Sequence, residues 1–324
     1  HHAGCEAEID FVAGRLGFDV VHERYDDGYN IGPERAARSW AAHGERWSSY
    51  DWAITSDTAP LSRLFLQNGF AGRLIVWVCN RFDYADQATN DCGFPDPEYY
   101  ELIRRAATLP TVALVSYNEF EHHYARARHV EIGRLTIRPT GNGTSSADWV
   151  DRGRSFFIPP YHNDTLFMDV AAECRAHAIP VYCGRYAGAD DLHGFRGVIH
   201  VPYAFSTFAF FENLQRGLVH FVPTRCFLRR LAGRRRLWRR LANRPGFFWT
   251  SNFDQANLDL AEWYRPDHAD VCVYFDSWSD LATRARDPGL DARRGAVAAF
   301  AARHTEVTLE QWRGVFRGLG ASVA

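Results

Sequence analysis

The chain alternates between short apolar runs and longer amphipathic stretches along most of its length. Runs rich in β-branched and aromatic residues predict strands, and apolar residues at every third or fourth position predict helices. In the first half we expect strands at residues 18–23, 51–56, 74–79, 112–117 and 135–138, and helices at 6–16, 32–50, 60–67, 97–107 and 119–128. In the second half we expect strands at 156–158, 180–183, 198–203, 218–222 and 271–275, and helices at 166–176, 208–215, 225–244, 278–286, 292–303 and 308–318. Such alternation is typical of mostly parallel, doubly wound sheets.

A stretch rich in Gly, Ser and Thr at residues 140–146 is the candidate linker. We therefore expect an α/β fold of two Rossmann-like domains that face each other across a cleft, with residues 1–147 in the first and 148–324 in the second. The last helices could pack back on the first domain. A doubly wound domain usually opens with a strand, whereas residues 1–4 look like the turn after one. Either that strand lies upstream or it is absent, and His1 and His2 could also be tag residues.

Composition narrows the class of protein. The 324 residues are 46% hydrophobic, which is enough for a large core, and the net charge of −2 does not favour binding of a polyanion by the whole molecule. The sequence contains no lysine, so all 37 basic residues are arginine. The seven cysteines show no C-x-x-C spacing. They predict reduced thiols and, because no apolar run approaches the roughly 18 residues of a membrane span, a cytoplasmic protein.

Residues 197–228 form the most informative stretch of the sequence. A buried strand at 198–203 is followed by Ser206 and Thr207, which favour the start of a helix, and Gly217 ends that helix. The N-terminus of a helix presents free amides that can bind a phosphate. Glu212 is the one acidic residue in this apolar helix.

Polar side chains follow most of the other predicted strands as well. In open α/β sheets, ligands bind beyond the carboxyl ends of the strands. The residues at such positions are Asp57, Asn80, Arg81 and Asn118 in the first half, and Arg185, Tyr203, Ser206 and Thr207 in the second. This pattern predicts a functional cleft between the halves, with Asn80, Arg81 and Asn118 as candidates for the acceptor side.

The segments C-G-R at 183–185, P-Y-A-F-S-T at 202–207 and F-E-N-L-Q-R-G at 211–217, with V-P at 222–223, resemble the donor-binding half of GT-B glycosyltransferases. The resemblance implies that the C-terminal domain holds a nucleotide-diphosphate sugar. It places Arg185 on the diphosphate, with Ser206 and Thr207 at the amides that bind it, Glu212 on the ribose, and Tyr203 in the same site. Ala204 stands where many retaining members carry a second glutamate.

Ordinary interpretations exist for each of these residues. Arg185 could form a surface ion pair, Ser206 and Thr207 could be helix caps alone, and Glu212 could be a solvated helix residue.

The resemblance also implies a transfer from UDP- or GDP-sugar to a hydroxyl of a glycan or glycoconjugate, without a metal or other cofactor. Such a transfer needs a base or stabilisation of the leaving diphosphate. His2 occupies the turn that carries the base in some inverting members, and Asp57 is the other candidate, unless it caps the next helix. Asp83 and Asp86 have the wrong spacing for a metal-binding D-x-D, and we expect His122, His123 and His129 to be solvated.

Residues 225–244 contain nine arginines with apolar residues on one helical face. A solvated helix is the first interpretation, peripheral contact with an anionic membrane the second, and nucleic-acid binding the last. Two alternatives to a glycosyltransferase remain open: a sugar-nucleotide epimerase of the same architecture, and a non-catalytic protein of twin α/β domains that binds a nucleotide or sugar.

Overall fold

The computed structural model describes residues 3–23, 25, 31–83, 96–142, 153, 155–160, 168–186, 189–202, 204–233 and 258–322. The chain divides into two compact units. Unit 1 contains residues 1–139 and 307–324, and unit 2 contains residues 140–306. No helix in the described part of the chain is long and apolar enough to cross a membrane.

Unit 1 is built on three parallel strands in the order β1 (Trp52–Thr55), β2 (Arg73–Val78) and β3 (Val112–Ser116). Ile54 pairs with Ile75, and Ile75 with Ala113. β2 lies in the centre and is almost entirely buried, as its apolar sequence R-L-I-V-W-V predicts for a strand covered on both faces.

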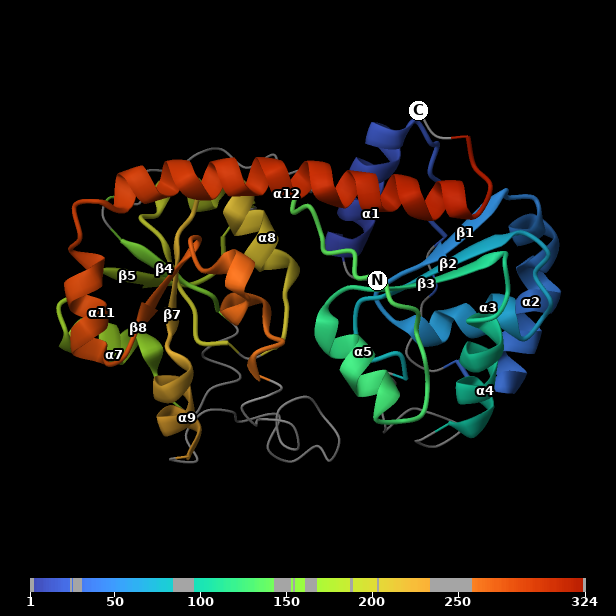
Figure 1. Cartoon of the computed structure of the whole chain (residues 1–324), viewed down its shortest axis with the longest axis horizontal. Coiled ribbons are helices and arrows are strands. Elements are labelled where there is room, and N and C mark those ends of the chain that lie inside the picture. The colour runs from blue at the N-terminus through green and yellow to red at the C-terminus, as the bar shows by residue number, and fades with distance from the viewer. Residues whose placement is uncertain are drawn as a thin grey trace. The chain divides into compact units, whose positions relative to one another are not determined.

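Helices cover both faces of this sheet (Figure 1). On one face lie α1 (Ala3–Leu16) and the C-terminal part of α12 (Leu290–Gly318), where the Trp312 ring meets Trp77 of β2 at 5.5 Å. On the other face lie α2 (Pro33–Ser48), the 3-10 turn η1 (Ala59–Ser62), α3 (Arg63–Leu66) and α4 (Pro97–Ala106). Helix α5 (Glu119–Arg126) follows β3.

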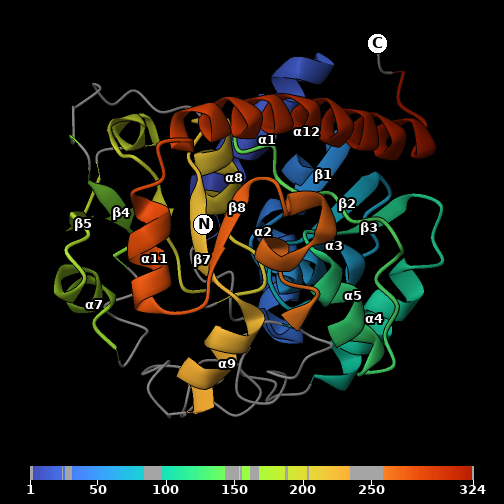
Figure 2. The ribbon, with the colours of Figure 1, turned by 60° about the vertical axis from the view of Figure 1, so that its left-hand side comes forward.

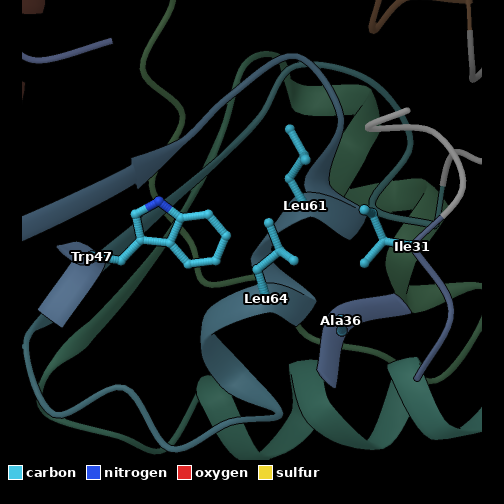
Figure 3. Close-up of a cluster of buried hydrophobic side chains, with 5 residues drawn as sticks. All are labelled: Ile31, Ala36, Trp47, Leu61 and Leu64. Carbon is cyan, nitrogen blue, oxygen red and sulfur yellow. The ribbon is translucent and has the colours of Figure 1, made fainter. Parts of the chain in front are cut away.

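The second face has its own apolar cluster of Ile31, Ala36, Trp47, Leu61 and Leu64, shown in Figure 3. These side chains come from α2, the residues before it, and the η1–α3 segment. The cluster fixes α2 against α3.

Unit 2 holds five parallel strands in the order β5-β4-β6-β7-β8. Their bounds are β4 (Phe156–Ile158), β5 (Val181–Cys183), β6 (Val198–Ile199), β7 (His220–Pro223) and β8 (Cys272–Phe275). The chain passes from β4 to β5 on one side and then returns to the other side for β6. Strand order therefore reverses between β4 and β6.

The helices of unit 2 also cover two faces. α7 (Val170–Ala176) and α11 (Trp278–Ala285) pack side by side on one face, and α8 (Phe208–Gln215) lies on the other (Figures 1 and 2). The remaining elements are η2 (Ala189–Gly194), α9 (Arg225–Gly233), η3 (Glu262–Tyr264), η4 (Pro266–His268) and residues 290–306 of α12.

These two sheets confirm the predicted α/β class with parallel sheets. Helix α8 has the predicted bounds, with Thr207 as its N-cap. Gly217 ends the helix at φ +65°, and the Leu218 amide donates to the Asn213 carbonyl, so the turn is the glycine-terminated type that the sequence indicates.

Several predicted elements were wrong. Residues 18–23 do not form a strand, although residues 18–21 are rich in apolar side chains, because no strand among the described residues pairs with them. Residues 135–138 contribute one parallel bridge, between Thr136 and Ser116. The helices predicted at 292–303 and 308–318 are one helix, α12, because residues 304–307 contain neither Gly nor Pro to interrupt it.

Candidate functional site

In unit 1, polar side chains gather after the carboxyl ends of all three strands. We call Asp57, Asn80, Arg81, Asp83, Asn118 and Glu121 the unit 1 polar cluster. Because parallel strands end at the same edge of a sheet, residues that are far apart in sequence meet there.

Asp57 follows β1 and is buried, and its φ of +66° lies in the left-handed region that a non-glycine residue rarely adopts. The Asn80 side-chain amide donates to the Asp57 carbonyl at 3.0 Å and lies 3.4 Å from its Oδ1. Asp57 does not cap the next helix, since Thr58 occupies the N-cap position of η1. Backbone strain that is held by burial and a neighbouring amide is a feature of functional sites.

Arg81 and Asn118 meet through Glu121. Arg81 forms a buried ion pair with Glu121, and its guanidinium lies 4.5 Å from the centre of the Phe120 ring. Asn118 caps α5 by accepting from the Phe120 amide at 2.9 Å, and its side-chain amide is 3.4 Å from Glu121 Oε1. Burial raises the pKa of Glu121, and the Arg81 charge offsets only part of this effect.

Asp83 forms a second buried anionic group beside the first. It accepts a hydrogen bond from the Tyr100 hydroxyl and lies 3.3 Å from Arg128 Nε. Burial raises the pKa of Asp83 despite both contacts. Within the described residues, Asp83 Oδ1 and Glu121 Oε2 are buried and have no hydrogen-bond partner.

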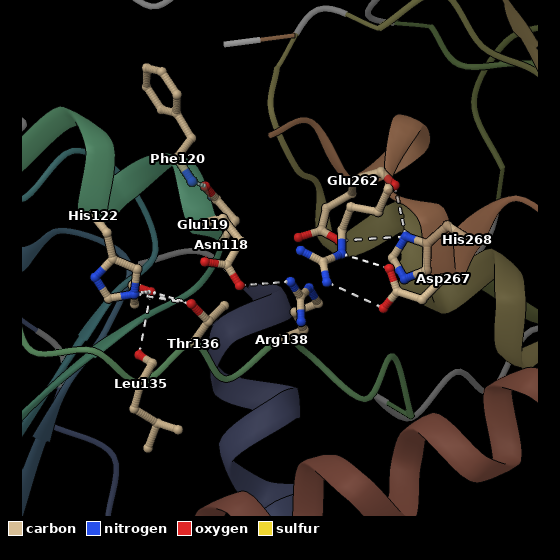
Figure 4. Close-up of polar contacts among 12 residues, drawn as sticks. Asn118, Glu119, Phe120, His122, Leu135, Thr136, Arg138, Glu262, Asp267 and His268 are labelled. Atoms are coloured by element: carbon tan, nitrogen blue, oxygen red, sulfur yellow. Dashed lines mark hydrogen bonds and ion pairs between the residues drawn. The ribbon is translucent and has the colours of Figure 1, made fainter. Parts of the chain in front are cut away.

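Contacts around the cluster hold α5 in place (Figure 4). Ser116 Oγ lies 2.6 Å from His122 Nε2 and 3.0 Å from Thr136 Oγ1. His122 is buried, so the expectation that it is solvated was wrong. Burial lowers the pKa of His122. His123 on the next position of the helix is exposed.

In unit 2, we call residues 200–202 and 204–207, which lie between β6 and α8, the β6–α8 turn. Thr207 accepts a hydrogen bond from the Phe210 amide at 3.2 Å. Ser206 is only 8% exposed, and its hydroxyl has no hydrogen-bond partner among the described residues. The turn starts where strand order reverses, which is where open parallel sheets bind ligands.

A segment that follows α9 in the chain fixes the back of the β6–α8 turn. The Glu262 amide donates to the Phe205 carbonyl at 2.8 Å, and the His200 ring stacks on Trp263 at 4.5 Å. Glu262 is fully buried; His268 Nδ1 lies 2.7 Å from its carbonyl and 3.5 Å from its carboxylate. Figure 4 shows this pair with Asp267. The turn thus rests on buried residues of the 262–268 segment.

The other predicted donor residues lie apart from the turn. Arg185 follows β5 and is exposed. Glu212 lies one turn inside α8, where Gly141 (φ +75°) packs so closely that an added Cβ would be 2.6 Å from the Glu212 nitrogen. His2 and Tyr203 lie outside the described residues.

The sequence analysis considered Asp83 only as a metal ligand, and it did not single out Glu121, Glu262 or His268. Glu121 had a usable signal, because an acidic residue three positions after an Asn N-cap is a helix-start pattern. Here that carboxylate binds Arg81 instead. Glu262 and His268 had no comparable signal.

Two arginines in the described part of the Arg-rich helix form polar contacts with other residues of unit 2. Arg225 Nε lies 2.6 Å from Asp259, and Arg230 donates to the Asp276 carbonyl. Residues 234–257 lie outside the described ranges. Across the ranges that the structure describes, no group of three or more His, Cys, Asp or Glu side chains could hold a metal ion.

Comparison of the sequence with protein-family models and with curated proteins finds no match.

Replacing Arg81 should destabilise unit 1 strongly. Arg81→Met leaves Glu121 buried without its cation, and we expect the free energy of unfolding to fall by about 3–5 kcal/mol. The double variant Arg81→Met/Glu121→Leu should recover most of that loss. Arg104→Met, which removes an exposed pair with Glu101 at 3.3 Å, is the control and should change stability by less than about 1 kcal/mol. Urea unfolding gives the free energy of unfolding of the original protein and of the three variants. A double variant as unstable as Arg81→Met would contradict the account.

His220 should make unit 2 sensitive to acid. Burial lowers the pKa of His220 to about 3, so the folded state keeps this ring neutral where the unfolded state, at an ordinary value of 6.5, binds a proton. The contribution of the neutral His220 ring to the free energy of unfolding is therefore fully present above pH 6.5 and is lost as the pH falls toward 3. His220→Gln should therefore reduce the slope of unfolding free energy against pH, between pH 4 and 6, by about 1.4 kcal/mol per pH unit. Urea unfolding at several pH values would show an unchanged slope if the account is wrong.

Proposed function

We propose that this chain is a metal-independent glycosyltransferase that binds a nucleotide-diphosphate sugar at the β6–α8 turn. The observation that carries the proposal is the position of this turn, which follows β6 directly at the reversal of strand order in unit 2. The finer fold assignment, two Rossmann-like domains of the GT-B type, is part of the same proposal.

The turn offers the groups that a diphosphate requires. The turn leads into the N-terminus of α8, where Thr207 accepts from the Phe210 amide, and the helix dipole favours a negative charge at this end. The Ser206 hydroxyl is desolvated and lacks a partner among the described residues, so a ligand oxygen would satisfy it. An unsatisfied buried hydroxyl beside a helix N-terminus supports anion binding better than a cap alone.

Arg185 would supply the cation. It follows β5, which is two strands from β6, or about 10 Å at ordinary strand spacing. An exposed arginine can span much of that distance, and its planar guanidinium suits a phosphate. Glu212 would bind the ribose only if the ligand extends along α8 past its first turn.

Unit 1 would supply acceptor binding and the base. Asp57 is the candidate base, because it is a buried carboxylate at the end of a strand with a strained backbone. Asn80 would hold Asp57 in place through the contact at 3.0 Å.

Calorimetric titration of UDP and GDP tests the site. Ser206→Ala should weaken binding by about 1 kcal/mol without lowering the melting temperature, since this hydroxyl makes no hydrogen bond with the described residues. Arg185→Ala should weaken binding by about 1–3 kcal/mol. Arg286→Ala, which changes another exposed arginine after α11, is the matched control and should bind normally.

Unchanged affinity in both site variants would refute the assignment. With binding established, incubation with the nucleotide sugar and an acceptor distinguishes the functions. Transfer supports the proposal, whereas an epimerised donor or no turnover would favour the epimerase or the non-catalytic protein.

A further inference from the structure

Two thiol groups meet at the carboxyl edge of the sheet in unit 1. Cys5 lies in the first turn of α1, and Cys79 directly follows the last residue of β2. The two side chains form a hydrogen bond, although they come from different elements and lie far apart in the sequence. Both are free thiols. A disulfide requires two cysteines that approach each other closely, and this contact meets that requirement.

Other contacts place Cys5 at the same edge. Cys5 is buried, but it lines a cavity of about 640 Å³ together with Ser56, which directly follows β1. The next residue, Asp57, accepts a hydrogen bond on its carbonyl from the Asn80 side chain at 3.0 Å, and Asn80 follows Cys79. The carboxyl ends of β1 and β2, the first turn of α1 and the two thiols therefore share one small region.

The surroundings of the two thiols determine which sulfur carries the proton of the hydrogen bond. Burial raises the pKa of the Cys79 thiol well above its usual value, and the hydrogen bond to Cys5 raises this pKa further. A hydrogen bond raises the pKa of the group that donates it, so the Cys79 thiol donates to the Cys5 sulfur. The Asp57 amide in turn donates to the Cys79 sulfur. Cys79 thus keeps its proton, and a thiolate on Cys5 receives a hydrogen bond from it.

Three other cysteines provide comparisons within the same chain. Burial raises the pKa of Cys174 and of Cys272 as well, but no neighbouring thiol contributes to either value. Cys226 is exposed to solvent. These residues separate the effect of burial, and the effect of exposure, from the effect of a second thiol in contact.

We infer that Cys5 and Cys79 form a modification site, at which a hydroperoxide produces an intramolecular disulfide. A small hydroperoxide reaches Cys5 through the cavity. The Cys5 thiolate attacks one peroxide oxygen, so that an S–O bond forms and the O–O bond breaks. The leaving oxygen takes up the proton that Cys5 released and departs as water or as an alcohol.

The second step consumes the sulfenic acid on Cys5. The Cys79 sulfur attacks the Cys5 sulfur, so that the S–S bond forms and the S–O bond breaks. The hydroxide that leaves takes the Cys79 proton and becomes water. The two thiols together lose two electrons, and the peroxide gains them. A dithiol reductant returns both cysteines to the free form by thiol–disulfide exchange.

The disulfide fixes the start of α1 to the end of β2. It also holds the sulfur that accepts from the Asp57 amide, so the oxidation acts next to a residue whose backbone is strained at φ +66°. The inference stands apart from the proposed function, because it requires neither a nucleotide nor an acceptor.

Peptide mass spectrometry of the full chain tests the inference. The folded protein, at low concentration, is treated with hydrogen peroxide, the remaining thiols are alkylated, and trypsin cleaves the chain after arginine. Cys5 then lies in the peptide of residues 1–15 and Cys79 in the peptide of residues 74–81, and neither peptide contains another cysteine. We expect these two peptides to be linked to each other, and we expect dithiothreitol to separate them.

Two controls accompany the experiment. Cys79→Ser should abolish the link and leave the alkylation of the exposed Cys226 unchanged. Peroxide treatment in urea should give much less of the link, because the two thiols no longer lie side by side. Folded protein in which alkylation recovers both thiols would overturn the inference, as would a link that forms equally well in urea. A link between two copies of the chain, visible as a dimer on a non-reducing gel, would also overturn it.

Discussion

Parallel strand pairing is the constraint on which both units depend. It forces every strand of a sheet to end at the same edge, so residues separated by tens of positions become neighbours there. In unit 1 this brings Asp57, Asn80, Arg81 and Asn118 to one edge, and in unit 2 it places the β6–α8 turn at the reversal of strand order. Polar groups that follow apolar strands are thereby concentrated in small regions.

Both units bury polar side chains, and each contains buried groups whose charge is paired or suppressed. Unit 1 pairs opposite charges, with Arg81 on Glu121 and Arg128 beside Asp83, because a buried carboxylate without a cation would be strongly disfavoured. Unit 2 keeps His220 neutral and leaves the Ser206 hydroxyl desolvated. Charge pairing offsets the burial of the carboxylates in unit 1, whereas the buried Ser206 hydroxyl in unit 2 has no hydrogen-bond partner among the described residues.

The structural features that the sequence predicted correctly are those that depend on the local pattern of residues. The bounds of α8, its Thr207 cap and its Gly217 terminus follow from capping and periodicity within about ten residues. The sequence also predicted that Asn80 and Arg81 follow the end of β2 and that Asn118 follows the end of β3, because a polar residue after an apolar run can be read from the sequence alone. The partners of these residues were not predictable: Glu121 meets Arg81 across 40 positions, and Glu262 supports Phe205 through a backbone contact that no side-chain pattern encodes. The strand predicted at residues 18–23 is absent for a related reason: a strand requires a neighbouring strand as well as an apolar sequence.

The central claim is that the β6–α8 turn of unit 2 binds the phosphates of a nucleotide. Its most direct test is an amide-resolved footprint of the whole chain, by hydrogen exchange or NMR, with and without saturating UDP. The account predicts that the largest changes fall on residues 206–210, at the start of α8. Changes confined to residues 80–83 of unit 1, or no change at any described amide, would contradict it.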